Sequence, residues 1–335
     1  LYTPKVTHNP RLSFLENQMQ FHVHTPTSFI HNTFTGIWRS AMLSKQLQKD
    51  EVDIYHGLSH ELPKGIEKTK IKNVVTIHDL IFIRYPHFFK AIDRKIYYHK
   101  ILHACQVADH IIAVSQQTKE DIMEYFAIPA HKITVVYQGC HQFFQSEVTQ
   151  EEKETVCNKH QLPKDYLLYV GSIEERKNLL TLLNSMKKLH EQQLVVIGNG
   201  KKYKKKCLKF VEDNNLNQRI HFLSGLSLNE MAAIYQSAEM MIYPSIFEGF
   251  GIPILEALFC KTPVITTKNG CFSESGGSHS YYINPLDENE LTQAIKHIQS
   301  DKNLRKRMID KGQQHAQKFT DEKIAENLMN IYQSL

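Results

Sequence analysis

The chain has 335 residues and a formal net charge of +5, and its composition, 41% hydrophobic and 22% charged, is ordinary for a globular protein. Its length exceeds the size at which one hydrophobic core usually stops growing, so we expect two domains. The mild charge does not indicate a nucleic-acid partner, and no run of about 18 apolar residues predicts a membrane span.

Short apolar strands alternate with helices in the first half, which predicts a doubly wound α/β domain. Such a domain normally opens with a strand and a glycine turn. Because nothing before Phe21 supplies both, we expect the natural first strand to be missing. We predict strands at Phe21–His24, Val52–Gly57, Asn73–His78, His110–Val114 and Lys132–Tyr137, and helices at Phe34–Lys49, Ala91–Ala108 and Gln116–Phe126, the last capped by Ser115.

A polar segment, Glu147–Asp165, precedes a second alternating series and is a candidate linker or exposed connecting helix. The final helix, Asp321–Tyr332, is expected to cross back to the first domain, so the predicted units are 1–160, 161–318 and 319–335. We predict strands at Tyr166–Val170, Leu194–Ile197, Arg219–Leu223, Met240–Tyr243, Pro263–Thr266 and Tyr281–Asn284, and helices at Leu179–His190, Lys201–Asn214, Leu228–Ser237, Pro253–Leu258, Asn289–Ser300 and Asn303–Lys318.

Two glutamates, Glu248 and Glu256, lie in the stretch YPSIFEGFGIPILE, where a strand leads through a glycine loop into a helix that begins near Pro253. The free N–H groups and the dipole of a helix start favour an anion such as a phosphate. Both carboxylates could reach one ligand there. Taken singly, each glutamate is more often structural: Glu256 as a favourable acid near a helix start, and Glu248 as a solvated side chain.

Other strand ends should gather at the same edge, because the carboxyl ends of parallel strands bind ligands in open α/β sheets. Gly171 is followed by Arg176 and Lys177, which could neutralise a diphosphate or form a solvated basic pair. Turns at Gly198 (LVVIGNG) and at Gly225-Leu226 (FLSGLS) could offer backbone groups to a ligand, and plain turn chemistry explains them equally well. GxxxxGK[ST] and GxGxxG occur nowhere, which excludes those two phosphate-binding motifs.

His78, followed by Asp79, ends a predicted strand of the first domain. A lone histidine there is more often a satisfied turn residue than a catalytic group. Two basic runs, Ile83–Lys100 and Lys201–Lys209, are most simply solvated helix faces; the alternatives are an acceptor lip or attraction to an anionic membrane. The six cysteines show no metal-site spacing and indicate reduced thiols in a cytoplasmic protein.

A resemblance to a known family is carried by YVGSIEERKNL, VVIGNG, FLSGLSLNEMAAIYQSAEMMIYPSIFEGFGIPILEAL and PVITT. Together they resemble the retaining glycosyltransferases of family 4, and VVTIHDLIFIRYP, IIAVSQQTKEDI and ITVVYQGC are similar to the acceptor domain of that family. The resemblance is strongest to bacterial mannosyltransferase-like members that build surface polysaccharides. It implies the GT-B fold: an α/β protein of two Rossmann-like, doubly wound domains that face a cleft.

The resemblance also implies a role for each matching residue. Glu256 would hold the ribose hydroxyls of the nucleotide, Glu248 the hydroxyls of the transferred sugar, and Lys177, with Arg176, the diphosphate. His78 would point into the cleft and stabilise charge on the sugar. Many members have an arginine where this chain has Ser172, which leaves Lys177 with more of the charge neutralisation. Backbone groups of Gly171, Gly198, Gly225, Leu226, Gly249, Phe250, Gly251 and Ile252 complete the candidate donor site.

We therefore expect a retaining hexosyltransferase that takes mannose or glucose from a GDP- or UDP-linked donor, without a cofactor or metal. Its acceptor would be a glycan or a lipid-linked glycan. The enzyme would be cytoplasmic, or peripheral on the inner face of the membrane, and would bind no nucleic acid. The alternatives are a sugar-nucleotide epimerase of the same two-domain plan and a non-catalytic module that binds a sugar nucleotide or a glycan.

Overall fold

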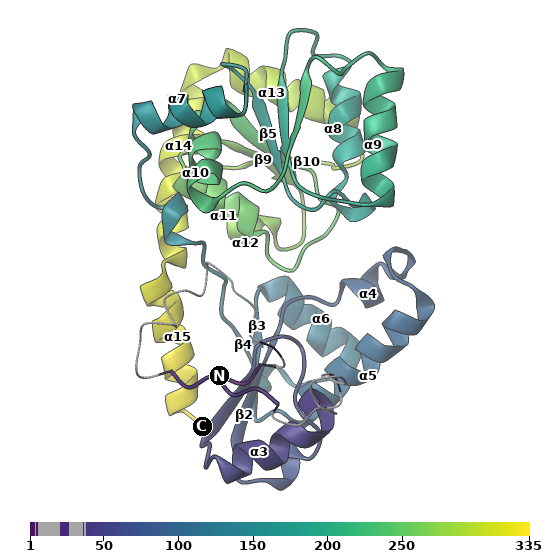
Figure 1. Ribbon diagram of the computed structural model, residues 1–335, viewed down its shortest axis with the longest axis vertical. Helices are drawn as coiled ribbons and strands as arrows, with labels where there is room; N and C mark the ends of the chain where they lie inside the picture. Colours follow the sequence, from purple (N-terminus) through teal and green to yellow (C-terminus); the bar gives the residue numbers. More distant parts are fainter. Residues whose placement is uncertain (4, 6–20, 27–35, 37) are drawn as a thin grey trace.

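Two α/β domains lie one above the other in the computed structural model, which describes residues 1–3, 5, 21–26, 36 and 38–335 (Figure 1). The lower domain holds a four-stranded sheet and the upper domain a six-stranded sheet, and every strand pair in both sheets is parallel. Parallel strands need crossover helices, and these cover both faces of each sheet.

The N-terminal sheet has the order β1-β2-β3-β4, so neighbouring strands follow one another in the chain. Its strands are β1 (Ile54–Gly57), β2 (Lys72–Ile77), β3 (His110–Ala113) and β4 (Ile133–Val135). The helices described in this domain are η2 (Trp38–Met42), α3 (Leu43–Lys49), η3 (Ile66–Lys68), α4 (Ile81–Arg84), η4 (Pro86–Phe88), α5 (Ala91–Val107), α6 (Gln116–Phe126) and η5 (Ala130–Lys132).

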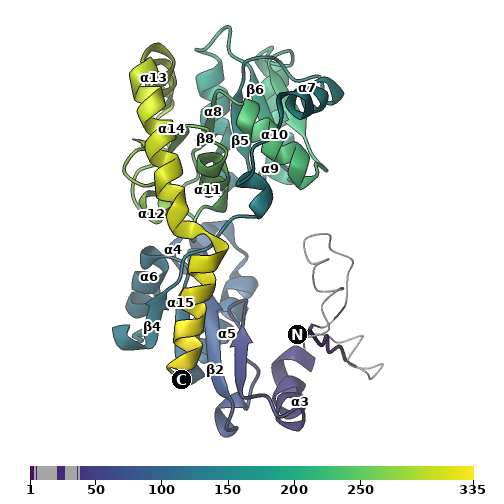
Figure 2. The same ribbon diagram turned by 90° about the vertical axis from the view of Figure 1, so that its left-hand side faces the viewer.

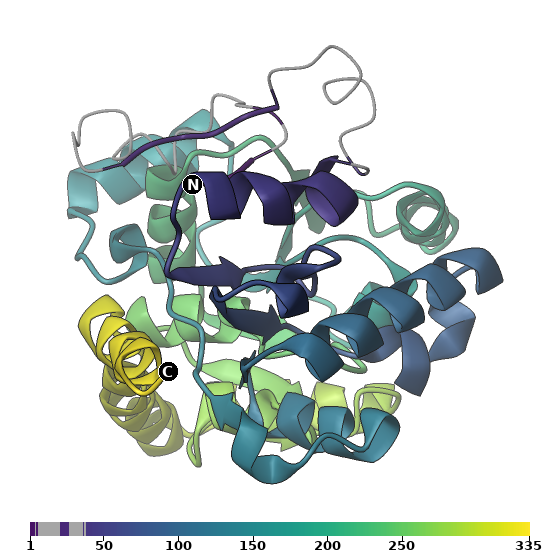
Figure 3. The ribbon, with the colours of Figure 1, turned by 90° about the horizontal axis from the view of Figure 1, so that it is seen from below.

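Alternate side chains of β2 and β3 pack on opposite faces of this sheet. Val75 and Ile111 face the cluster that α3, α5 and α6 supply, whereas Val74 and Ile112 contact the last helix, α15 (Asp321–Gln333), through Ile331. Figure 3 shows α15 and α5 on opposite sides of the strands. The C-terminal helix of the chain therefore completes the core of the N-terminal domain.

The C-terminal sheet has the order β10-β9-β8-β5-β6-β7. From β5 the chain adds β6 and β7 on one side, and then β8, β9 and β10 on the other side, so the order of strands switches at β5. Ligands bind at such switch points in open α/β sheets. The strands are β5 (Leu167–Val170), β6 (Leu194–Ile197), β7 (Ile220–Leu223), β8 (Met240–Tyr243), β9 (Val264–Thr267) and β10 (Tyr281–Ile283). The helices are η7 (Glu175–Lys177), α8 (Leu179–Met186), α9 (Lys202–Asp213), α10 (Leu228–Ser237), α11 (Ile252–Phe259), α12 (Phe272–Gly276), α13 (Glu288–Ser300) and α14 (Lys302–Ala316).

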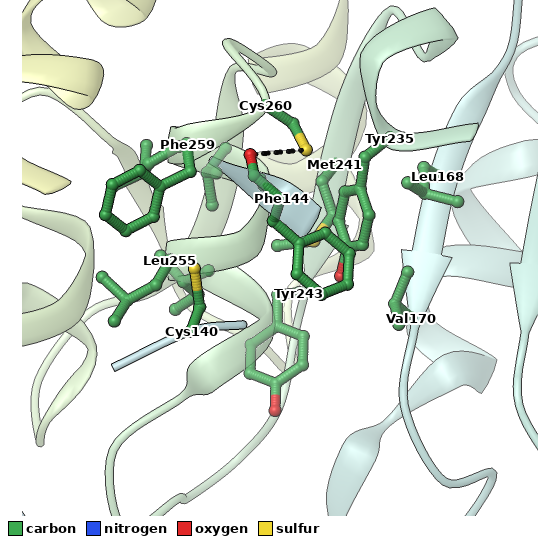
Figure 4. Close-up of a cluster of buried hydrophobic side chains, with 14 of the residues drawn as sticks. Cys140, Phe144, Leu168, Val170, Tyr235, Met241, Tyr243, Leu255, Phe259 and Cys260 are labelled. Atoms are coloured by element: carbon green, nitrogen blue, oxygen red, sulfur yellow. Dashed lines mark hydrogen bonds between the residues drawn. The ribbon is translucent and has the colours of Figure 1, made fainter. Parts of the chain in front are cut away.

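The chain passes between the domains along one side of the molecule. The first passage includes η6 (Gln142–Phe144) and leads to α7 (Gln150–Lys159); in Figure 4 the Phe144 ring lies among Tyr235, Met241 and other buried side chains of the upper domain. The second passage is η8 (Gln317–Phe319), which joins α14 to α15 (Figure 2). Both passages are thus anchored by packing rather than left as free linkers.

Most of the predicted elements are confirmed within a residue or two, including the helix that begins after Ser115, whose side chain accepts from the Thr118 N–H. The predicted strand Phe21–His24 is wrong: His24 forms only an isolated bridge with Tyr2, so this stretch is not part of a sheet. The start of the predicted helix Phe34–Lys49 falls outside the described residues. In the part of the chain that the structure describes, no helix is long and apolar enough to cross a bilayer.

Candidate functional site

The loop between β8 and α11 carries the first of the two glutamates. Gly251 is the N-cap of α11 and has a φ of 98°, a left-handed conformation that side chains other than glycine rarely adopt. Pro253 follows in the first turn, where its missing N–H is not needed. The predicted order of strand, glycine loop and helix is confirmed, and it places Glu248 under the carboxyl edge of the sheet with only 8% of its surface exposed.

Four protein groups surround the Glu248 carboxylate. Arg176 Nη1 lies 2.8 Å and Lys177 Nζ 2.5 Å from its two oxygens. The hydroxyls of Tyr243 and Ser245 also donate to it, over 3.0 and 2.5 Å. A buried carboxylate is stable only when it is paired and hydrogen-bonded in this way. The cluster concentrates two cations around one buried carboxylate, and Arg176 pairs in addition with the half-exposed Glu174.

Burial alone would raise the pKa of Glu248, but the ion pairs with Lys177 and Arg176 outweigh it and lower the pKa below its ordinary value. Burial likewise disfavours the Arg176 cation, and the nearby Glu248 more than offsets this, so the pKa of Arg176 is raised. Glu248 and Arg176 are therefore both charged near neutral pH.

Arg176 and Lys177 come from η7, directly after β5, the neighbour of β8 in the sheet. Arg176 also donates to the Phe247 carbonyl over 2.5 Å and pairs with Glu174 over 2.9 Å. The Lys177 side chain passes 3.8 Å from where a Cβ on Gly171 would lie. The structure thus brings together the two predicted cations, Glu248 and the glycine that ends β5.

Glu256, on α11, has different surroundings from Glu248. It is partly exposed, and its carboxylate accepts a hydrogen bond from the Tyr235 hydroxyl over 2.8 Å. Burial, with the nearby Glu256 charge, raises the pKa of Tyr235 well above its ordinary value, so Tyr235 remains a donor. The two glutamates therefore hold separate positions: one neutralises cations, and the other is held in place by a tyrosine.

His78 follows β2 in the N-terminal domain, and both of its ring nitrogens contact protein groups. Nε2 lies 2.8 Å from the Leu58 carbonyl and Nδ1 lies 3.2 Å from the Gln138 amide nitrogen. A Cβ added to Gly249 would lie 2.0 Å from the His78 carbonyl oxygen, so only glycine fits there. The glutamate loop of one domain thus rests directly on the end of a strand of the other.

The remaining candidate residues lie along the same edge. Gly198 follows β6, and Gly225 and Leu226 follow β7, two strands away from β5. Phe250 is buried and stacks on Tyr137 of the first passage, with ring centroids 5.5 Å apart. Ile252 is the first residue of α11. The edge therefore extends from the charged cluster at β8 and β5 to the turn after β7.

Sequence reasoning missed Tyr243, Ser245 and Tyr235, which hold the two glutamates. Tyr243 and Ser245 stand five and three residues before Glu248 in the same stretch, and their hydroxyls were the available signal. Tyr235 had no such signal, because it lies on α10, a different element from the loop and the helix that carry the two glutamates.

A cleft of about 1010 Å³ lies between the domains. The N-terminal domain supplies Asp79, Ile81 and the segment 87–89, and the C-terminal domain supplies the loops after β5 and β6 with the start of α9. The pKa of Asp79 is raised chiefly by burial. Asp79 follows His78 directly, so the cleft approaches the candidate site from the side of the N-terminal domain.

Two family models match the chain: Glycosyltransferase Family 4 over residues 3–141 and Glycosyl transferases group 1 over residues 150–315. The chain is 30% identical over 227 residues to the O-antigen chain mannosyltransferase RfbU of Salmonella typhimurium, covering 67% of this chain and 60% of that protein. It is 28% identical over 289 residues to the O-antigen chain mannosyltransferase B of Escherichia coli, covering 84% and 74%.

Among solved structures, HepE from Anabaena in complex with UDP-glucose superposes with a TM-score of 0.78, over 98% of this chain and 90% of that one. At 16% identity this similarity shows the fold alone. It confirms the predicted plan of two Rossmann-like domains facing a cleft. The two family models meet near the passage between the domains and together span most of the sequence. The chain therefore belongs to glycosyltransferase family 4, a family of hexosyltransferases with the GT-B fold.

Proposed function

We propose that this protein is a retaining glycosyltransferase that transfers a hexose, mannose or glucose, from a nucleotide-diphosphate sugar to a glycan or lipid-linked acceptor during the synthesis of a surface polysaccharide. The single observation that carries the proposal is the buried cluster of Arg176, Lys177 and Glu248, which gathers two cations at the switch point of the C-terminal sheet. The O-antigen mannosyltransferases among the relatives support the polysaccharide assignment.

The donor would lie along the carboxyl edge of the sheet, with a GDP or UDP moiety. Glu256, held by Tyr235, would accept hydrogen bonds from the ribose hydroxyls. Lys177 and Arg176 would neutralise the diphosphate, assisted by the N–H groups at the start of α11. Glu248 would hold these two cations in position and offer its remaining acceptor capacity to hydroxyls of the transferred sugar.

The transfer would proceed by front-face attack, in which the leaving phosphate takes the acceptor proton. The main catalytic contribution would be electrostatic, because Lys177 and Arg176 are held at the carboxyl edge of the sheet, where the diphosphate would gain charge. His78 would position the sugar, with its ring orientation fixed by the contacts with Leu58 and Gln138. We propose that the reaction needs neither a metal ion nor a cofactor.

We further propose that the enzyme works on the cytoplasmic side and touches the membrane surface through α5. That helix exposes Ile92 and Ile96 together with Lys95, a combination suited to an anionic bilayer. Sedimentation with vesicles that contain an anionic lipid should carry the protein down, and an Ile92→Ser/Ile96→Ser variant should remain in the supernatant. Equal sedimentation of both proteins would refute this contact.

Thermal-shift titration with GDP, UDP and their hexose conjugates tests the donor assignment, since a ligand that binds the folded state raises its stability. Glu256→Ala should weaken nucleotide binding, whereas Glu248→Ala should reduce turnover more than nucleotide affinity. Glu151→Ala, on the exposed face of α7, is the control. Conversion of donor without any acceptor would point instead to an epimerase, and donor binding without any turnover to a non-catalytic module.

A further inference from the structure

The interdomain cleft has two chemically different walls. Phe88 and Phe89, with His87, form the wall on the N-terminal domain, and the His87 and Phe88 rings lie 4.2 Å apart. The opposite wall comes from the C-terminal domain and is charged, with an excess of cations: Lys201, Lys202, Lys206 and Arg176 line it together with Glu174, which pairs with Arg176, and Glu175. Aromatic rings on one side and cations on the other match the faces of a sugar that carries a negative charge.

The three lysines have no ion-pair partner among the described residues. Lys202 and Lys206 are one turn apart on α9, where like charges repel, and the first turn of this helix contains no acidic residue. Cations at a helix start are also disfavoured by the helix dipole. The chain therefore accepts an electrostatic cost at this position, and an anionic ligand would remove it.

The donor already has its own cations. Arg176 and Lys177 are engaged with Glu248, and the segment Ser172–Arg176 forms part of the wall that the C-terminal domain supplies. In Figure 1 the lower end of α9 lies above the part of the N-terminal domain that contains α4, and the lining of the cleft shows that this is the end where the helix begins. The lysines at the start of α9 line the same cleft as Arg176 but are not part of its cluster with Glu248, and they lie opposite the wall that the N-terminal domain supplies.

We propose that this cleft binds the acceptor, and that Lys201, Lys202 and Lys206 recognise an anionic group on it: a phosphate, a diphosphate or a carboxylate. The inference rests on the proposed glycosyl transfer and narrows its acceptor class. The accepting hydroxyl lies toward Asp79, at the inner end of the cleft, the sugar ring packs on Phe88 and Phe89, and the charged group meets α9. The C-terminal domain thus contributes to acceptor specificity as well as to donor binding.

The test uses a matched pair of double variants of the full chain. Lys202→Ala/Lys206→Ala removes two charges that face the cleft, and Lys205→Ala/Lys209→Ala removes two charges with the same spacing on the same helix that do not line it. Calorimetry, with and without saturating UDP or GDP, measures the Kd of three probes. These are a decyl diphosphate-linked N-acetylglucosamine, a glucuronic acid disaccharide, and the uncharged decyl N-acetylglucosaminide.

An anionic probe should bind the parent more tightly than the uncharged probe, and its Kd should rise about tenfold or more in Lys202→Ala/Lys206→Ala. The control pair should change it by less than about twofold, because two surface charges away from the cleft are largely screened. Comparison of the Kd values of the two anionic probes shows whether the cleft prefers a lipid diphosphate or an acidic glycan.

Equal losses in the two double variants, or equal binding of charged and uncharged probes by the parent, would overturn the inference. If the proposed donor function is wrong, the protein will bind neither UDP nor GDP. The probe titrations without nucleotide still measure whether the lysines bind an anionic ligand in that case.

Discussion

Glu274 of the C-terminal domain accepts a hydrogen bond from the backbone N–H of Gln116, at the start of α6 in the N-terminal domain, over 2.7 Å. The neighbouring N–H of Gln117 donates to the other oxygen over 3.2 Å. One carboxylate thus caps a helix of the opposite domain and ties the two domains together across the cleft.

Glu274→Ala should loosen this closure. Each hydrogen bond to a charged group contributes about 1.5–3 kcal/mol, so losing two should shift the equilibrium toward an open form. Small-angle scattering should report a larger radius of gyration, and nucleotide affinity should fall. Glu274→Gln keeps an acceptor oxygen and should show a smaller change. Unchanged scattering for Glu274→Ala would mean that the contact does not control closure.

Gly249→Ala should disturb the junction between the domains, because its Cβ would lie 2.0 Å from the His78 carbonyl oxygen, a backbone atom. Overpacking of this kind typically costs about 1–3 kcal/mol. We expect a lower melting temperature and a strong loss of transfer. Gly36→Ala adds the same methyl group where nothing lies within 4 Å, and should leave both properties unchanged.

Glu248→Gln should destabilise the protein by about 3 kcal/mol at neutral pH, because it leaves two buried cations without their counter-charge. The pKa of Glu248 is lowered, so its contribution is present above pH 4.5 and is lost as the pH falls below that value. Chemical unfolding of the variant should therefore depend less on pH in that acid range.

Glu174→Gln is the matched control for that experiment. Glu174 also pairs with Arg176, but about half of its side chain is exposed, at 49%. Exposed ion pairs contribute little, so this variant should unfold like the parent. A similar decrease in the free energy of unfolding for Glu174→Gln and Glu248→Gln would contradict the central role of Glu248.

His60 and His56 should make the protein sensitive to mild acid. Burial, with the nearby His78, lowers the pKa of each to about 4, from an ordinary value of 6.5. The unfolded chain therefore takes up protons first, and the free energy of unfolding should fall between pH 6.5 and pH 4, by about 3 kcal/mol per histidine at the lower end.

Urea unfolding across that pH range checks this expectation with His60→Asn. Asparagine tolerates the φ of 60° at this position and removes the titrating group. The variant should lose about half of the pH dependence, whereas the exposed His279→Asn should retain all of it. A parent whose stability is flat between pH 6.5 and pH 4 would show that these histidines are not held neutral.

Tyr235→Phe should weaken nucleotide binding about tenfold without unfolding the protein, because Glu256 loses the hydroxyl that orients it. Tyr166→Phe removes another buried tyrosine hydroxyl, which donates to the Ile234 carbonyl. Its nucleotide Kd should match that of the parent. Equal Kd values for both variants would separate Tyr235 from the donor site.

The alternation of strands and helices could be predicted because apolar periodicity and capping residues act locally, as at Ser115 and Ser227. The glycine loop before α11 was predictable for the same reason. Phe21–His24 misled the prediction because a short apolar run forms a strand only when a neighbouring strand pairs with it, and here only Tyr2 meets His24.

The charged cluster could be predicted only in part. Sequence order places Arg176, Lys177 and Glu248 at strand ends, but does not reveal that the two cations turn toward the glutamate. The contact of Gly249 with His78 depends on how the domains dock, which no local pattern encodes. The role of each residue toward the donor stays a prediction.

The two passages between the domains have a mechanical consequence. They lie on the same side of the molecule, and a Cβ added to Gly139 of the first would meet Ile324, just beyond the second, at 2.8 Å. Two connections on one side favour opening of the domains by rotation about that side over separation along a straight line. In Figure 1, α9 and α4 lie on the other side of the molecule from the passages, so in such a rotation this side would move furthest. A ligand bound between these two helices would therefore stabilise the closed arrangement most effectively. The stacked rings of Tyr137 and Phe250, near the passages, would move least.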